Sequence, residues 1–151
     1  MASVWSGTDQ QMGRAIAIKV LHLTGPAGRS AWSRFEREAR ATAAVNDPHI
    51  VTVHDTGIDN GTAYLILELL PGPTLSQYLS DTGPMPIAMV LDVTGQVCEA
   101  LAAAHHLGIV HRDIKPSNVM FRDHHRVKVL DFGITQLVGD ATTDMTLTAT
   151  G

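Results

Sequence analysis

The segment spanning residues 111–133 holds charged and amide side chains at separations that suit phosphoryl transfer. It reads HRDIKPSNVMFRDHHRVKVLDFG, with Lys115 between Asp113 and Asn118, and with Asp131 before a Phe-Gly pair. Moving a phosphoryl group requires cations on its oxygens and an acceptor hydroxyl held in line. Carboxylate and amide oxygens suit Mg²⁺, which binds proteins through few groups. The pattern therefore predicts a metal-assisted phosphoryl-transfer site.

These motifs resemble the catalytic loop and the Asp-Phe-Gly motif of protein kinases, most closely the eukaryotic-like (Hanks-type) serine/threonine kinases of bacteria. The resemblance implies that Asp113 accepts the proton of the substrate hydroxyl and that Lys115 steadies the transferring phosphoryl group. It also implies that Asn118 and Asp131 bind Mg²⁺ (or Mn²⁺). A lysine two residues after Asp113 is typical of serine/threonine rather than tyrosine kinases. A lone Asp would be read as a turn residue, so the combination carries the prediction.

A lysine interrupts a predicted apolar strand at residues 15–21. Burying Lys19 costs free energy unless it is paired or binds an anion. The alternative is a strand-edge lysine whose ammonium group reaches water. The run Ile16-Ala17-Ile18-Lys19 is similar to the third-strand motif of the kinases, which implies that Lys19 contacts the α- and β-phosphates of ATP.

A helix is predicted over residues 30–45, because Ser30 can cap it and Pro48 resists its continuation. Glu38 falls on its apolar face at helical spacing, where an acid needs a cation. The resemblance pairs such a glutamate with the third-strand lysine, so Glu38 is the predicted partner of Lys19. Glu36 points about 160° away from Glu38 on an ideal helix and is the weaker choice.

The predicted adenine site lies where a sheet gives way to helices. Two strands, residues 50–53 and 64–68, flank an Asp-Asn-Gly turn that is a strong hairpin signal. They lead into the hinge segment, residues 69–72, which in kinases joins two lobes. The resemblance implies that the backbone of Glu68 and Leu70 hydrogen-bonds adenine. Apolar residues, which core packing would equally predict, would surround the ring: Val4, Ala17, Leu67 and Met120.

The second half of the chain is predicted to be mainly helical. A short helix is expected over 74–79 and a long one over 87–107, which Gly108 ends. The long helix is apolar nearly all round, which is typical of a buried helix. In kinases that burial comes from a later helix, which is not expected within these 151 residues. A small hairpin of residues 118–121 and 127–130 should bring Asn118 and Asp131 close together.

Eight histidines raise the alternative of a zinc site. His105-His106 and His124-His125 are adjacent pairs, and neighbouring residues point in different directions, unlike the i, i+4 arrangement of zinc sites. Zinc is therefore disfavoured. His111 resembles the kinase histidine that packs on the phenylalanine of the Asp-Phe-Gly motif, which implies a structural role.

Length and composition limit the possible classes of protein. With 151 residues the chain can form one core but is short for a two-lobe kinase domain. It is 44% hydrophobic and 17% charged with a net charge of −4, so no basic field predicts nucleic-acid or anionic-membrane binding. The side chain of the single cysteine, Cys98, is expected to be buried within the protein. A lone cysteine, which can form no internal disulfide, also fits a reducing, cytoplasmic compartment. No run is expected to span a bilayer, and no signal peptide is evident.

The resemblance is partial at both ends. Residues 1–5 resemble the tail of a glycine-rich loop, with Ala2 at the third glycine position, and residues 133–151 resemble the start of an activation loop. The sequence therefore predicts an internal fragment of a kinase domain. Thr146 and Thr148 resemble phosphorylated positions, and a phosphate there could pair with Arg112. A polar tail is the alternative.

The predicted fold class is α+β, an incomplete protein-kinase-like two-lobe fold. Residues 1–70 would form a partial N-terminal lobe that lacks its first strand and most of the glycine-rich loop. Residues 71–151 would form a partial C-terminal lobe that ends in the activation loop. The implied function is ATP-dependent phosphoryl transfer to Ser or Thr of a protein substrate, with weak or no turnover from this stretch alone. A non-catalytic nucleotide- or partner-binding fragment, docked on another kinase chain, is the alternative; Asp131-Phe132-Gly133 and Lys115 disfavour a small-molecule phosphotransferase.

Overall fold

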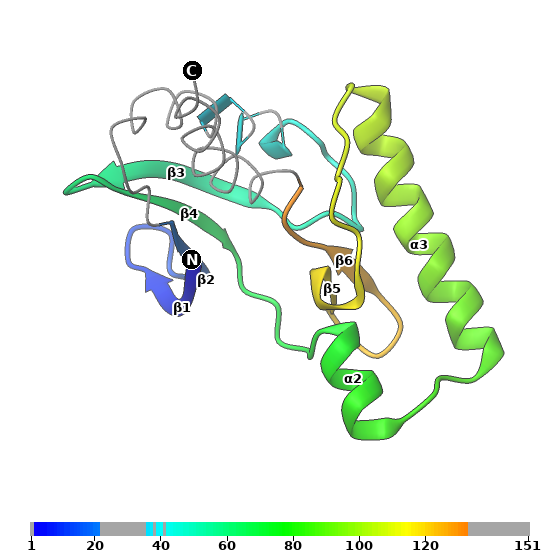
Figure 1. Ribbon diagram of the computed structural model, residues 1–151. Coiled ribbons are helices and arrows are strands. Elements are labelled where there is room, and N and C mark those ends of the chain that lie inside the picture. The colour runs from blue at the N-terminus through cyan, green and yellow to red at the C-terminus, as the bar shows by residue number, and fades with distance from the viewer. Residues whose placement is uncertain (1, 22–35, 38, 41, 133–151) are drawn as a thin grey trace, which may run out of the picture.

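The computed structural model describes residues 2–21, 36, 37, 39, 40 and 42–132, and the structural statements below concern these residues. A four-stranded antiparallel sheet has the order β1-β2-β4-β3 and consists of β1 (Ala2–Asp9), β2 (Arg14–Leu21), β3 (Val53–Asp59) and β4 (Thr62–Glu68). The helical part follows, with α2 (Leu75–Thr82), α3 (Ile87–His106), the 3₁₀ turn η1 (Pro116–Asn118) and the hairpin β5 (Val119–Phe121) and β6 (Val127–Val129). The two parts lie side by side, and the segment after β4 joins them (Figure 1).

The predicted turn between β3 and β4 is confirmed. Asn60 and Gly61 have φ values of 47° and 77°, the left-handed pair that a two-residue hairpin requires. The strand predicted at 50–53 is wrong, because β3 begins only at Val53. Residues 49–51 instead run alongside β6: Val51 N–H donates to the Val129 carbonyl at 3.0 Å. This segment therefore joins the sheet to the β5–β6 hairpin.

One face of the sheet carries the core of the N-terminal part. Leu21 and Ala63 are directly opposite each other in the β2–β4 ladder, and Leu65 lies two residues further along β4, so all three share a face. Ala39 packs against them. Residues 36, 37, 39, 40, 42 and 43 are helical, within the predicted helix. The predicted ion-pair residue of that helix, Glu38, lies outside the described residues.

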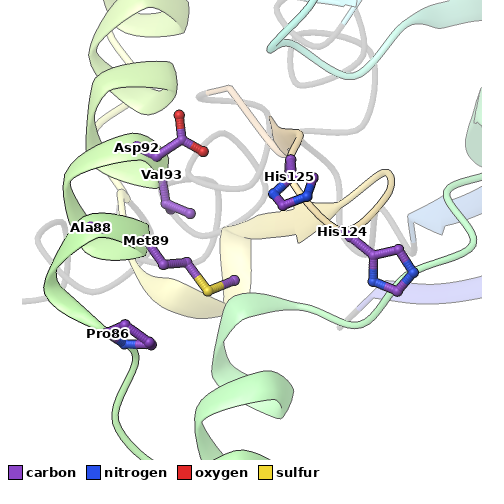
Figure 2. A pocket seen from close by; sticks show the side chains of 7 residues that line it. All are labelled: Pro86, Ala88, Met89, Asp92, Val93, His124 and His125. Atoms are coloured by element: carbon purple, nitrogen blue, oxygen red, sulfur yellow. The ribbon is translucent and has the colours of Figure 1, made fainter.

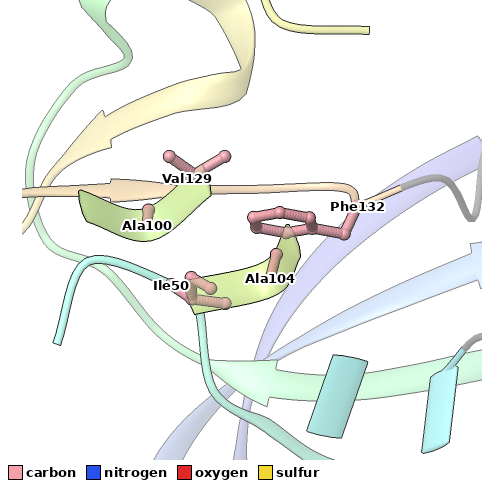
Figure 3. Packing of buried hydrophobic residues seen from close by; sticks show 5 residues of the cluster. All are labelled: Ile50, Ala100, Ala104, Val129 and Phe132. Atoms are coloured by element: carbon pink, nitrogen blue, oxygen red, sulfur yellow. The ribbon is translucent and has the colours of Figure 1, made fainter. Parts of the chain in front are cut away.

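A second core joins α3 to the β5–β6 hairpin. Ala100 and Ala104, one turn apart on α3, pack against Ile50, Val129 and Phe132 (Figure 3). The small alanine side chains let the helix approach the hairpin closely. The phenylalanine that follows Asp131 is thereby fixed from the helix side, which holds the end of the hairpin in place.

The outer face of α3 is exposed in the described part of the chain, which agrees with the expectation that in kinases a later helix covers this face. Ile87 is 79% and Leu91 68% exposed, and Cys98 is exposed rather than buried. An apolar sequence indicates that a surface can be covered and not that it is. The expectation that no run could span a bilayer is also wrong by length and composition alone, because α3 meets both criteria. It does so because its apolar residues extend round the whole helix.

The hinge segment and α2 pack tightly on β5. Phe121 N–H donates to the Pro73 carbonyl at 2.9 Å, and Thr74 forms an isolated antiparallel β-bridge with Met120. The Thr74 hydroxyl also accepts from Gln77 N–H at 3.1 Å and so begins α2 with a capping box. A Cβ on Gly72 would lie 2.3 Å from the Phe121 carbonyl oxygen. This contact leaves room for glycine alone.

We expect Gly72→Ala to lower the free energy of unfolding by about 1–3 kcal/mol, because the hinge segment must move off β5 to admit the methyl group. Thermal melts would measure the change. Gly95→Ala in α3 is the matched control: a Cβ there meets nothing within 4 Å, so removal of a helical glycine should stabilise by up to about 1 kcal/mol. Equal effects of the two substitutions would show that the Gly72 contact has no importance.

Candidate active site

Four of the predicted nucleotide-binding residues lie on one face of the sheet. Val4 is directly opposite Lys19 in the β1–β2 ladder, and Ala17 is directly opposite Leu67 in the β2–β4 ladder. Directly opposed side chains point to the same side, and so do residues two apart on one strand. Val4, Ala17, Lys19 and Leu67 are therefore brought together.

The lysine of β2 is buried and paired. Lys19 is 5% exposed, and its Nζ lies 2.5 Å from Asp131 Oδ1. The alternative of an edge lysine that reaches water is wrong. Asp131 has a φ of 58°, a left-handed backbone conformation that an L-residue adopts at a free-energy cost. The residue in this strained conformation is the one whose carboxylate meets the lysine.

The catalytic loop forms a compact polar cluster. Lys115 Nζ lies 2.7 Å from Asp113 Oδ2. The Asn118 amide nitrogen donates to the Asp113 backbone carbonyl at 2.8 Å and to its Oδ2 at 3.1 Å. The hydrogen bond from Lys115, more than any other contact, holds the pKa of Asp113 below its ordinary value. Asp113 is therefore a carboxylate that can accept a proton or a hydroxyl hydrogen bond.

The predicted hairpin is present and sets Asn118 against Asp131. Leu130, the residue before Asp131, donates its N–H to the Asn118 carbonyl at 2.8 Å. Because the Asn118 amide nitrogen is directed to Asp113, its side-chain oxygen is the atom left for a cation. That oxygen and the Asp131 carboxylate are hard donors of the kind that Mg²⁺ prefers. The donor set fits the predicted metal.

His111 links the catalytic loop to the segment before Asp131. Its Nε2 donates to the Leu130 carbonyl at 2.7 Å, while its Nδ1 accepts from Asp113 N–H at 3.2 Å. These opposite roles assign the neutral Nε2–H tautomer. The ring also packs on Phe132, with centroids 4.7 Å apart. The neighbouring Arg112 has a φ of 64° and is exposed; its predicted partners, Thr146 and Thr148, lie outside the described residues.

The predicted adenine-binding residues border the hinge segment. Glu68 ends β4, and its N–H donates to the Thr52 carbonyl at 3.0 Å. Leu70 is buried two residues further on, and Met120 lies in β5. Met120 forms an isolated β-bridge with Thr74, just after the hinge segment, and Ala17 and Leu67 are directly opposite each other in the sheet that precedes it.

Sequence reasoning missed one charged residue of this region, Lys128 in β6. Its Nζ lies 2.5 Å from Glu68 Oε1 and donates to the Ile50 carbonyl at 2.9 Å. Burial alone would raise the pKa of Glu68, but hydrogen bonds from Lys128 and Thr52 N–H hold that pKa below its ordinary value. A lysine between two valines was the available signal, the same signal that identified Lys19.

The adjacent histidines His124 and His125 lie on the turn between β5 and β6. They border a cavity of about 380 Å³ beside α3 with Met89 and Asp92, and their side chains point in different directions (Figure 2). Among the residues that the structure describes, no group of three or more His, Cys, Asp or Glu side chains is placed to hold a metal ion.

Comparison with known sequences identifies the family. The model of the protein kinase domain matches residues 1–151. A probable serine/threonine-protein kinase, pknA2 of Bifidobacterium longum, is 38% identical over 97% of this chain and 20% of its own length. PknA of Mycobacterium tuberculosis is 41% identical over 93% of this chain and 34% of its own length. The chain thus spans roughly a fifth to a third of these relatives.

Solved structures agree with the sequences. The kinase domain of M. tuberculosis PknI matches with a TM-score of 0.79 and 32% identity over 89% of this chain and 54% of its own. Rad53 in complex with AMP-PNP matches with a TM-score of 0.78 and 25% identity over 88% of this chain and 35% of its own. The described residues therefore form part of the protein-kinase fold, and the chain belongs to the protein kinase family, with bacterial serine/threonine kinases among its relatives.

Proposed function

We propose that residues 1–151 carry the nucleotide-binding and catalytic residues of an ATP- and Mg²⁺-dependent serine/threonine protein kinase. The single observation that supports this most strongly is the meeting of the two parts of the chain at one charge pair. Lys19 of the sheet and Asp131, which follows β6 by two residues, are 112 residues apart in sequence and in contact at 2.5 Å. A cation for phosphate and a carboxylate for metal thus lie side by side, as phosphoryl transfer requires.

The proposed roles follow from the contacts. Lys19 binds the α- and β-phosphates of ATP, while Asp131 and the Asn118 side-chain oxygen hold the metal. Bound Mg²⁺ supplies positive charge to the phosphate oxygens. Asp113 accepts the hydrogen of the Ser or Thr hydroxyl and holds the substrate in line, and Lys115 stabilises charge on the transferring phosphoryl group.

The adenine ring is proposed to lie against the hinge segment. The Glu68 N–H is bonded to Thr52, so the Glu68 carbonyl is the group that accepts a hydrogen bond from adenine, and the Leu70 backbone provides the second contact. Val4, Ala17 and Met120 would enclose the ring. This placement implies two partial lobes, residues 1–70 and 71–151, that meet at the hinge segment. We also propose a cytoplasmic location, because a single cysteine fits a reducing compartment.

We further propose low turnover from residues 1–151 taken alone, because they span only about a fifth to a third of the length of their kinase relatives and 54% of a solved kinase domain. A second candidate function is non-catalytic: a nucleotide-binding piece that docks on another kinase chain. The exposed apolar face of α3, with Ile87 and Leu91, is the observation that favours it.

We expect radiolabelled γ-phosphate from Mg²⁺·ATP to appear on Ser or Thr of a generic protein substrate and not on an aminoglycoside. Asp113→Asn should lower the rate by about 10²–10³-fold, because the substrate hydroxyl loses its acceptor. Quantified incorporation with phosphoamino-acid analysis would measure this. Aminoglycoside labelling would contradict the protein-kinase assignment, whereas nucleotide binding without any transfer would favour the non-catalytic function.

A further inference from the structure

Lys128 is a buried cation that the proposed chemistry does not use. It lies in the middle of β6, where Val127 and Val129 are buried in the clusters that α3 contacts. Side chains alternate along a strand, so Lys128 points to the opposite face. It is 4% exposed. An ammonium group is costly to bury unless its charge is paired and its hydrogens are bonded.

The ammonium group of Lys128 connects three segments of the chain. It contacts Glu68 Oε1 at the end of β4 and donates to the Ile50 carbonyl. The same Glu68 oxygen accepts from Thr52 N–H at 2.7 Å. β6, β4 and residues 50–52 therefore meet at one charge pair. Each member of the pair also has a hydrogen bond to the backbone of residues 50–52.

This charge pair stands between the two ends of the proposed nucleotide site. Glu68 belongs to the proposed adenine end, where its carbonyl would accept a hydrogen bond from the base. Lys128 precedes Asp131, at the metal end, by three residues of the same extended segment. A bond between the two fixes one end relative to the other. An apolar contact could slide by a fraction of an ångström, whereas this hydrogen-bonded charge pair has one geometry.

We propose that Lys128 and Glu68 form a positioning pair that holds the metal-binding carboxylate of Asp131 at a set distance from the hinge segment. Lys128 touches neither nucleotide nor metal and acts through the backbone of β6. The inference rests on the proposed nucleotide binding. It predicts that the pair couples adenine binding to metal binding, which a purely stabilising contact would not do.

Three ligands separate positioning from stabilisation. Adenosine uses the adenine end alone, ATP in EDTA adds the phosphates, and Mg²⁺·ATP requires both ends in register. We expect Lys128→Met to bind adenosine within about twofold of the parent chain. The extra affinity that Mg²⁺ gives to ATP should fall by about 10–100-fold, the usual loss when a group that orients a metal ligand is removed.

Calorimetric titration of the 151-residue chain with each ligand would test this, at a temperature where melts show both proteins folded. Lys128→Arg keeps the charge and donors and should restore most of the Mg²⁺-dependent gain. Arg126→Met is the matched control, because it removes a cation from the same hairpin whose pair with Asp123 is exposed. It should change no affinity.

Each other outcome counts against the proposal. An equal loss for all three ligands, or no loss for any, in a folded Lys128→Met chain would show that Lys128 only stabilises the fold. A loss with Arg126→Met of the same size would trace the effect to net charge. If the parent chain binds no nucleotide, both the proposed function and the positioning role of the Lys128–Glu68 pair fail. If the parent chain binds nucleotide but Lys128→Met keeps the full gain in affinity from Mg²⁺, the proposed function stands and only the positioning role is overturned.

Discussion

Asp131→Asn is expected to abolish the stabilisation of this chain by Mg²⁺·ATP. At a hundred times its dissociation constant, a ligand that binds only the folded state adds about 2.7 kcal/mol. For a chain of this size that raises the melting temperature by roughly 5–10 °C. Asparagine tolerates the left-handed backbone at residue 131. It lacks the charge that pairs with Lys19 and binds the metal, so the rise should be lost in the variant.

The matched control for this melt is Asp123→Asn. Asp123 is a carboxylate on the turn of the same hairpin, where it pairs with exposed Arg126. The same chemical change there should leave the response to Mg²⁺·ATP intact. A full response in the Asp131 variant would remove this residue from the metal site, and an indifferent parent would remove the site itself.

Glu68→Gln is expected to destabilise the chain by about 3–5 kcal/mol, the usual cost of leaving a buried charge without its partner. The Lys128 side chain is 5% exposed and that of Glu68 20%. Loss of the Glu68 charge therefore strands the more deeply buried ion. Lys128→Met leaves a carboxylate nearer to water and should cost less, about 0–2 kcal/mol. Denaturant unfolding of both variants would measure the difference.

The double variant Glu68→Gln/Lys128→Met provides the decisive comparison. Since it has no unpaired charge, it should be more stable than Glu68→Gln alone, with a coupling energy of about 1–3 kcal/mol. Two effects that simply add would show that the charges do not interact.

Acid unfolding checks the same pair independently. The hydrogen-bond partners of Glu68 hold its pKa below the ordinary value. The pair therefore stabilises the fold fully at pH values above the ordinary pKa of a glutamate. The stabilisation is lost as the pH falls through the lowered pKa of the folded state. The parent should lose stability over this acidic range more steeply than the double variant.

Local sequence patterns predict several features of the candidate active site. A lysine in an apolar strand indicated that Lys19 needs an anionic partner, and the structure provides Asp131. The small hairpin that brings Asn118 close to Asp131 is predicted from the sequence as well. Such features depend on neighbours in sequence or on the cost of burying a charge, and both can be read from residue types.

Features that depend on distant segments were missed or wrong. The run of residues 50–53 has the composition of a sheet strand, but its first residues pair with β6, nearly 80 positions later. Cys98 was expected to be buried because α3 is apolar, but exposure is decided by what packs there. The partner of Lys128 is 60 residues away, and no local pattern identifies Glu68 as that partner.

The pairing of residues 49–51 with β6 bears on the division of the chain into lobes. His49 accepts from Val129 N–H, and Val51 donates to the Val129 carbonyl, so the segment from the first lobe completes a ladder in the second. A cut at the hinge segment would leave the edge of β6 open and residues 49–51 without these backbone partners. The two proposed lobes are therefore joined by backbone hydrogen bonds as well as by the hinge segment, and we expect neither to keep these bonds when it is separated from the other.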